Sequence, residues 1–216
     1  MALLDLLMPP ACAGCGTAGA LLCSGCQGRL ASPGRPQDRF LAPDAGIVIG
    51  DALTLAMAAF AYAGPMRRAL AALKYSGASR VAPILAQAAL SRLSCLQAIS
   101  GPATLVAVPV HRERMRVRGY NQADLIARLL ARRAVLPISP LLVRVRPTTK
   151  QHRLNRTARL ANLRGAFGIA PASRIPATVI VVDDIVTTTA TLEACASVLR
   201  EGGVGAVFGF AIAREV

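Results

Sequence analysis

The chain has 216 residues, of which 54% are hydrophobic and 17% charged, so it has room for one full domain with a sizeable core. This composition excludes an intrinsically disordered protein. The formal net charge is +14, and nearly all of the excess lies in residues 111–164, which hold 14 Lys and Arg against Glu113 and Asp124. Such concentrated positive charge indicates a polyanionic ligand, either phosphates or nucleic acid.

The N-terminal region contains two Cys-x-x-Cys pairs separated by seven residues, formed by Cys12, Cys15, Cys23 and Cys26. Four thiolates suit a closed tetrahedral zinc site, which stabilises a segment too small to fold alone. Two disulfides and a redox pair are the alternatives, although a reducing cytosol disfavours disulfides and the presence of two pairs argues against a redox pair. We expect structural Zn²⁺ in residues 1–30, followed by a linker at 31–50.

From residue 51 onward, apolar stretches of strand length alternate with longer helical patterns. The predicted strands are 53–62, 103–110, 140–145, 177–183 and 204–212. The predicted helices are 65–74, 80–98, 120–135 and 190–201. Continuous apolar strands separated by helices are typical of a parallel sheet with helices on both faces. We therefore expect an α/β domain at residues 51–216.

The segment 108–123 follows a predicted strand and carries alternating arginines at Arg112, Arg114, Arg116 and Arg118. Arginine side chains can bind phosphate oxygens in a bidentate manner, so we predict a phosphate-binding loop. The plain alternative is a solvated basic loop. His111 is equally compatible with an exposed residue that has no catalytic role.

A second basic segment, residues 146–168, is long and weakly periodic, which is typical of a functional loop. Its cations include Lys150, Arg153, Arg156 and Arg159. A surface of this kind would bind the phosphates of a nucleic acid rather than stack on its bases.

The most informative motif is VIVVDDIVTTTATLE, residues 179–193. An apolar strand delivers Asp183 and Asp184 at its carboxyl end, which is where parallel sheets bind ligands. The loop and helix start that follow offer backbone N–H groups and hydroxyls for a phosphate, at Thr187, Thr188, Thr189, Ala190 and Thr191. Adjacent carboxylates suit the vicinal hydroxyls of a ribose, so the motif predicts a ribose-5-phosphate site. An ordinary capped helix would explain only one of the threonines.

Residues 179–192 resemble the motif that binds 5-phosphoribosyl 1-pyrophosphate (PRPP) in type I phosphoribosyltransferases. The whole chain resembles the ComF/GntX family, in which an N-terminal zinc-binding segment precedes such a domain. Besides the Cys pairs, the matching pieces are Leu73-Lys74-Tyr75, VPVHRERMRVRGYNQA and QHRLNRTARLANLRGAF. One residue departs from the pattern: Thr189 stands where the family has Gly, which a close turn around phosphate favours.

The resemblance implies a type I phosphoribosyltransferase fold that binds Mg-PRPP. Asp183 and Asp184 would hold the ribose hydroxyls, directly or through Mg²⁺, as the catalytic pair, and residues 187–191 would hold the 5-phosphate. Arg112, Arg114 and Arg118 would bind the pyrophosphate, and residues 146–168 would form a hood loop that closes over PRPP. For Lys74, favourable charge at a helix C-terminus is a plainer explanation than a direct contact with the substrate.

ComF-like proteins are associated with DNA uptake during natural competence, for which the basic segments would suit single-stranded DNA. We therefore expect a competence-type protein with a PRPP site, a surface for single-stranded DNA and DNA-processing partners. The alternative is an active phosphoribosyltransferase. The start of the chain lacks a basic signal-peptide region, and no clean apolar run of about 20 residues follows, so we expect a cytoplasmic location.

Overall fold

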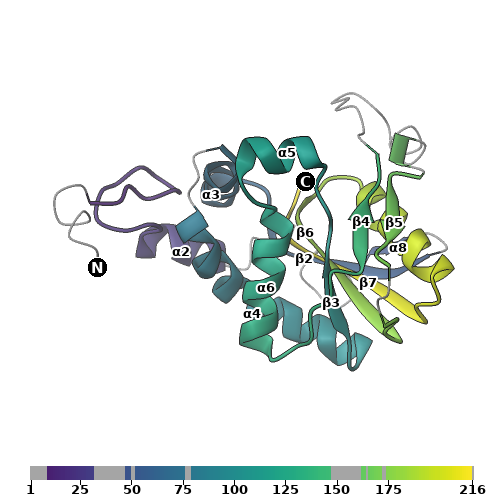
Figure 1. Cartoon of the computed structure of the whole chain (residues 1–216). Coiled ribbons are helices and arrows are strands. Elements are labelled where there is room, and N and C mark those ends of the chain that lie inside the picture. Colours follow the sequence, from purple (N-terminus) through teal and green to yellow (C-terminus); the bar gives the residue numbers. More distant parts are fainter. Residues whose placement is uncertain are drawn as a thin grey trace.

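The computed structural model describes residues 9–31, 47–49, 52–75, 79–146, 162–163, 165–171 and 174–215 (Figure 1). A five-stranded sheet with the order β1-β2-β7-β6-β3 forms its centre. Four strands are parallel, namely β2 (Leu53–Ala61), β7 (Ala206–Arg214), β6 (Thr178–Val186) and β3 (Thr104–Ala107). The short strand β1 (Ile47–Ile49) pairs antiparallel with β2 at one edge.

Helices cover both faces of this sheet, as predicted. The helices α4 (Ala82–Ser100) and α6 (Gln122–Ala134) pack on one face, and α8 (Ala190–Glu201) packs on the other (Figure 1). The strand β6 explains why: Ile180 and Val182 join the core under α4 and α6, while Val179 and Val181 join the core under α8. All four side chains are fully buried, which fits the continuous apolar sequence of a central parallel strand. The α/β prediction is confirmed.

The N-terminal segment packs against the main domain through the helix α2 (Ser24–Ala31), which contacts α4 and the helix α3 (Gly64–Tyr75). Leu22 and Leu30 belong to the same buried core as Leu70 of α3. The short 3₁₀ helix η3 (Ser79–Val81) leads into α4. The division of the chain at residues 30 and 50 stays a prediction, because most of the linker lies outside the described residues.

The predicted strand 140–145 does not join the parallel sheet. It forms β4 (Leu142–Arg144), which pairs antiparallel with β5 (Phe167–Ile169) in a separate two-stranded sheet. The edge of β3 is already occupied, since Leu105 N donates to Pro137 O and Ser139 N donates to Leu105 O. Pro140 follows, and a proline cannot donate a further ladder hydrogen bond.

Two other elements differ from the expected boundaries. The predicted basic loop contains the helix α5 (Arg112–Arg118), whose first turn is capped by His111, with Nδ1 accepting from Glu113 N at 3.4 Å. Gly119 ends this helix with a φ of 78°, a conformation that favours glycine. The strand β6 continues to Val186, so Asp184 also lies within the strand, whereas the predicted strand ended at Asp183. No helix in the described part of the chain is long and apolar enough to span a membrane.

Candidate functional site

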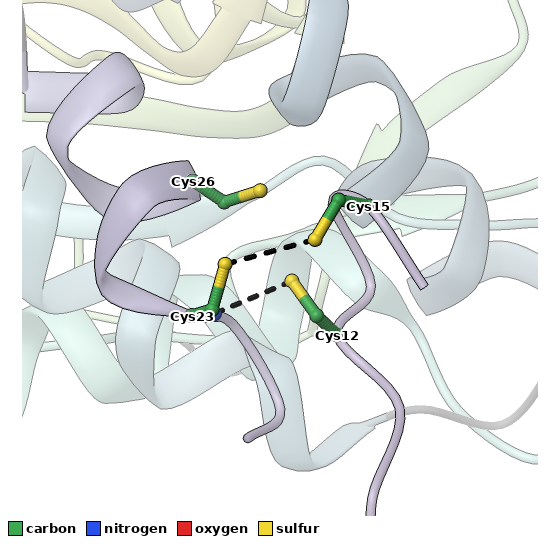
Figure 2. Close-up of side chains that lie close together, drawn as sticks. All are labelled: Cys12, Cys15, Cys23 and Cys26. Carbon is green, nitrogen blue, oxygen red and sulfur yellow. Dashed lines mark hydrogen bonds between the residues drawn. The ribbon is translucent and has the colours of Figure 1, made fainter. Parts of the chain in front are cut away.

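The four cysteine thiols of the N-terminal segment converge on one point (Figure 2). Cys12 and Cys15 come from a loop, Cys23 directly precedes α2, and Cys26 lies in its first turn. Their Sγ atoms all lie within 4.8 Å of one another, and all four are free thiols. The Cys15 and Cys23 sulfurs are 3.7 Å apart, close to the separation of about 3.8 Å expected for two sulfurs bound to one tetrahedral zinc.

The surroundings of the cluster also fit a thiolate-bound metal. Hydrogen bonds from the backbone N–H groups of Gly14 and Cys23, each 3.3 Å from Cys12 Sγ, stabilise the thiolate. Although burial opposes ionisation, these bonds lower the pKa of Cys12 to about 6. A Cβ on Gly14 would lie 2.7 Å from Cys26 Sγ, so only glycine fits beside the cluster. The donor set is therefore compatible with a structural metal such as zinc.

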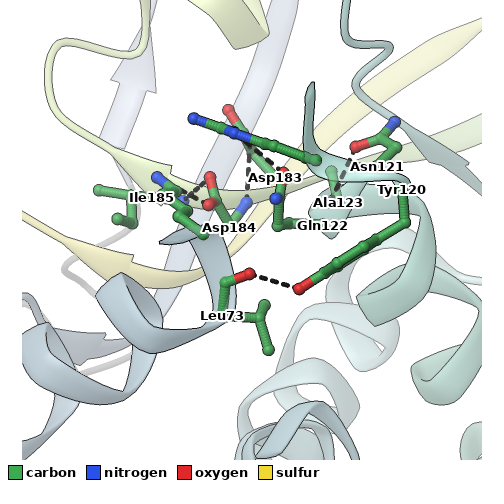
Figure 3. A network of polar contacts seen from close by, with 10 residues as sticks. Leu73, Tyr120, Asn121, Gln122, Ala123, Asp183, Asp184 and Ile185 are labelled. Carbon is green, nitrogen blue, oxygen red and sulfur yellow. Dashed lines mark hydrogen bonds and ion pairs between the residues drawn. The ribbon is translucent and has the colours of Figure 1, made fainter. Parts of the chain in front are cut away.

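The acid pair lies near the carboxyl end of β6, where it contacts the C-terminus of α3 (Figure 3). Lys74 Nζ lies 2.7 Å from Asp184 Oδ2. The other oxygen, Asp184 Oδ1, accepts from the N–H of Ile185 at 2.8 Å, and Asp183 Oδ1 accepts from the N–H of Asp184 at 2.8 Å. Lys74 was predicted only as a helix-end cation, and its contact with Asp184 is a finding of the structure.

The two carboxyl groups have different environments. Burial, reinforced by the negative charge of Asp184, raises the pKa of Asp183 to about 8. Asp184 instead has the Lys74 ammonium beside it, 2.7 Å from Oδ2. The pair therefore combines a carboxyl group that readily holds a proton with one that is charge-neutralised by lysine.

The threonine loop bends around a small hollow at the start of α8. The hollow is lined by Asp183 and by the consecutive residues 185–192. Thr189 precedes the helix with a φ of 52°. This is the left-handed region of the backbone, which favours glycine, the residue that the family has at this position. Its hydroxyl donates to the carbonyl of Thr188 at 2.6 Å. Asp183 and the threonine loop thus border the same hollow.

Arginines from two elements gather near the acid pair. Arg114 and Arg118 of α5 are half-buried, while Arg112 and Arg116 are exposed. Burial lowers the pKa of Arg144 on β4, the charge of Arg114 lowers it further, and the charge of Asp183 acts in the opposite direction. The Arg144 guanidinium also lies 5.2 Å from the ring centre of Phe167 on β5.

The segment after α5 ties these elements together. Tyr120 OH donates to the carbonyl of Leu73 (Figure 3), one residue before the lysine that pairs with Asp184. Asn121 caps α6 through Oδ1, which accepts from Ala123 N at 3.0 Å, while its Nδ2 donates to Val108 O at 2.9 Å. Arg118 Nη1 donates to Gln122 Oε1 at 3.1 Å. The Arg-Gly-Tyr-Asn-Gln sequence therefore joins α3, the end of β3 and α6.

Comparison with known proteins agrees with this architecture. The chain is 32% identical over 167 residues to DNA utilization protein YhgH of Escherichia coli K12, which covers 72% of this chain and 70% of that protein. The corresponding protein of Salmonella typhi is 31% identical over 160 residues, with the same coverage. The chain belongs to the ComF/GntX family. No family profile matches it.

A further member of the family, Competence protein F of Haemophilus influenzae, is 35% identical over 116 residues, which are 52% of this chain. The chain spans about half the length of that protein, 51%. Membership confirms the resemblance drawn from the motifs. Lys150, Arg153, Arg156 and Arg159 lie outside the described residues, so their nucleic-acid role stays a prediction.

Sequence reasoning missed Lys74 as the partner of Asp184 and Arg144 as a neighbour of Asp183. The first had a weak signal, because Leu-Lys-Tyr was among the matching family pieces. The second had none, since Arg144 was assigned to a strand of the parallel sheet rather than to a separate ribbon beside the acid pair.

Proposed function

We propose that this protein is a competence-type DNA-utilisation protein that binds a phosphorylated ribose, in particular PRPP, at the carboxyl end of β6. The observation that carries the proposal is Asp183, next to Asp184 on the same strand, at the hollow formed by the threonine loop. Backbone N–H groups at the start of α8 suit the 5-phosphate, and the two carboxyl groups suit the 2- and 3-hydroxyls of the ribose. The names of the relatives, Competence protein F and DNA utilization protein YhgH, support the cellular role.

Arginines of α5 would bind the pyrophosphate end of PRPP. Arg114 and Arg118 are half-buried and belong to the helix that follows β3, the strand beside β6. Their guanidinium groups would bind the pyrophosphate of PRPP. Arg112, which the resemblance assigns to the same role, has an exposed side chain.

Mg²⁺ would enter this site together with the pyrophosphate of the ligand. The acid pair alone is a poor trap for a divalent cation, because Lys74 already neutralises Asp184 and burial favours the protonated form of Asp183. The same features favour hydrogen bonding to sugar hydroxyls, for which Asp183 can donate or accept.

Calorimetry with PRPP tests this function. The parent protein should bind PRPP, and the variant carrying Asp183→Asn and Asp184→Asn should not, because amides accept more weakly from ribose hydroxyls and leave Lys74 without its partner. Glu201→Gln, an exposed acid at the end of α8, is the matched control and should bind like the parent. Equal binding by the Asn pair variant would exclude the ribose assignment.

An active phosphoribosyltransferase is the second candidate. It is favoured by the position of Arg114 and Arg144 near Asp183, where cations would stabilise a departing pyrophosphate. It is favoured also by the β4–β5 ribbon, whose strands flank the segment expected to close over PRPP. Pyrophosphate release from PRPP in the presence of individual nucleobases would separate turnover from binding alone, and no release with any of them would exclude the transferase.

We also propose that the basic surface binds single-stranded DNA. Its support is the net charge of residues 111–164, in a family whose relatives include a protein named for DNA utilization. Binding should weaken with added salt by about 0.7 in the log–log slope for each phosphate neutralised. A flat salt response would contradict an electrostatic surface.

A further inference from the structure

A second hollow, of about 140 Å³, lies on the side of β3 that faces away from β6. It shares no lining residue with the hollow of the threonine loop. Its walls are mostly apolar and include Pro109, Met115 of α5, Ile138 and Leu142. Asp124 and Arg128 of α6 also line it, which brings charged groups to an otherwise apolar space.

The backbone of β3 supplies polar groups to this hollow. The N–H and C=O of Leu105 point away from β6, because they bond to Pro137 O at 2.8 Å and Ser139 N at 3.0 Å. Val108 N points the other way and donates to Val182 O. Since backbone groups alternate along a strand, the N–H and C=O of Ala107 point toward the same side as those of Leu105. Ala107 lines the hollow, so one donor and one acceptor border it.

The rim adds a second polar pair. Arg128 Nε lies 2.8 Å from Asp124 Oδ2, and both side chains remain more than one-third exposed. Apolar walls with a few hydrogen-bonding groups at their edge are what a flat heterocycle needs. Nucleobases combine apolar faces with donors and acceptors around the ring, and proteins that read single strands hold splayed bases in this way.

The helix α5 brings positive charge to the mouth of the hollow. Met115, which lines it, is 43% exposed, and the next residue, Arg116, is exposed on the solvent side of the helix. A strand whose phosphate contacts Arg116 would have a base within reach of Met115. Val117, although 88% exposed, lies on the opposite side of the helix from Met115 and does not line the hollow.

We infer that the hollow between β3, α5 and α6 receives a nucleobase of a single DNA strand whose phosphate contacts Arg116. This inference rests on the proposed DNA binding and adds a contact that depends on the base. The charge of α5 favours a strand over a free base, because a base without phosphates would gain nothing from the arginine.

The test compares two labelled 15-nucleotide strands of equal charge, one of thymidine and one of abasic sites. The parent protein should bind the thymidine strand about tenfold more tightly, the scale expected of base contacts in single-strand binding. Met115→Ala should remove most of this preference, since it takes away an apolar wall. Val117→Ala is the matched control and should keep the preference, while Arg116→Gln should weaken binding of both strands. The exposure of these side chains leaves the fold intact.

The outcomes distinguish a failure of the base pocket from a failure of the proposed DNA binding. Equal binding of the thymidine and abasic strands would overturn the base pocket while leaving the electrostatic DNA surface standing. Binding of neither strand at low salt would overturn both proposals. If thymidine monophosphate displaced the strand at concentrations near the strand's own dissociation constant, the hollow would be a mononucleotide site and the strand interpretation would be wrong.

Discussion

Substitutions at Thr189 can measure the backbone strain at the proposed phosphate site. Its φ of 52° and ψ of −6° lie in the left-handed region, where a β-branched residue is unfavourable. Holding a non-glycine residue there costs about 1–3 kcal/mol. Glycine removes this cost but loses about 0.5–1 kcal/mol through its greater freedom in the unfolded chain. Alanine keeps the strain, and both substitutions remove the hydrogen bond from the Thr189 hydroxyl to Thr188 O.

We therefore expect Thr189→Gly to be more stable than Thr189→Ala by about 1–2 kcal/mol. In a chain of this size the difference corresponds to about 2–4 °C in Tm for each kcal/mol. Thermal and urea unfolding of the two variants measure it, and the pairwise comparison isolates the backbone effect because the hydroxyl is absent from both. Equal stability of the two variants would refute the positive φ of residue 189.

The same pair of variants shows where the strain acts. Because a close turn around phosphate favours glycine, the sequence pattern predicts that Thr189→Gly tightens phosphate binding. The left-handed conformation of Thr189 is part of the fold, so the relief should appear in the free energy of unfolding and change PRPP affinity by less than about tenfold. A larger gain in affinity would mean that the strain arises only when phosphate binds.

Three further predictions concern the remaining sites. The protein should contain one zinc per chain, and Cys12→Ser should release it and unravel the N-terminal segment, as metal analysis and circular dichroism would record. Burial raises the pKa of Asp183 from 3.8 to about 8, so the folded protein holds a proton that the unfolded chain releases. Stability should therefore fall as pH rises between about 4 and 8, and Asp183→Asn should flatten the profile. Replacing Arg153, Arg156 and Arg159 by Gln should weaken binding to all DNA sequences equally and reduce the salt slope.

The fold was predictable because its strongest signals are local. The apolar run of β6, the acid pair and the start of α8 at Ala190 are contiguous, so one stretch of sequence specifies a strand, a ligand loop and a helix. The Cys pairs are equally local, and their thiols converge as their spacing predicted. Lys74 was different: it meets Asp184 only through the packing of α3 against the end of the sheet, which no local pattern encodes.

The predicted strand at 140–145 shows that the pairing of strands is also beyond local sequence patterns. Its residues have the apolar character of a strand, and β4 forms, but sequence pattern does not say which partner a strand takes. The partner was decided by Pro137 to Pro140, which occupy the edge of β3 and then direct the chain away from it. Arg144 of β4 consequently belongs to a ribbon outside the parallel sheet.

The helix α5 is the most important difference between the predicted and the observed structure, because it changes which arginines lie on the same surface. It is seven residues long and buries no side chain, so periodicity could not reveal it; His111 at its start and Gly119 at its end specify it instead. In an extended loop, alternating arginines would all point to one side. In a helix, residues four apart share a face, so Arg114 and Arg118 are half-buried while Arg112 and Arg116 face solvent. One apparent phosphate-binding run thereby becomes two surfaces, of which the half-buried one belongs to the proposed sugar-phosphate site and the exposed one to the proposed DNA surface.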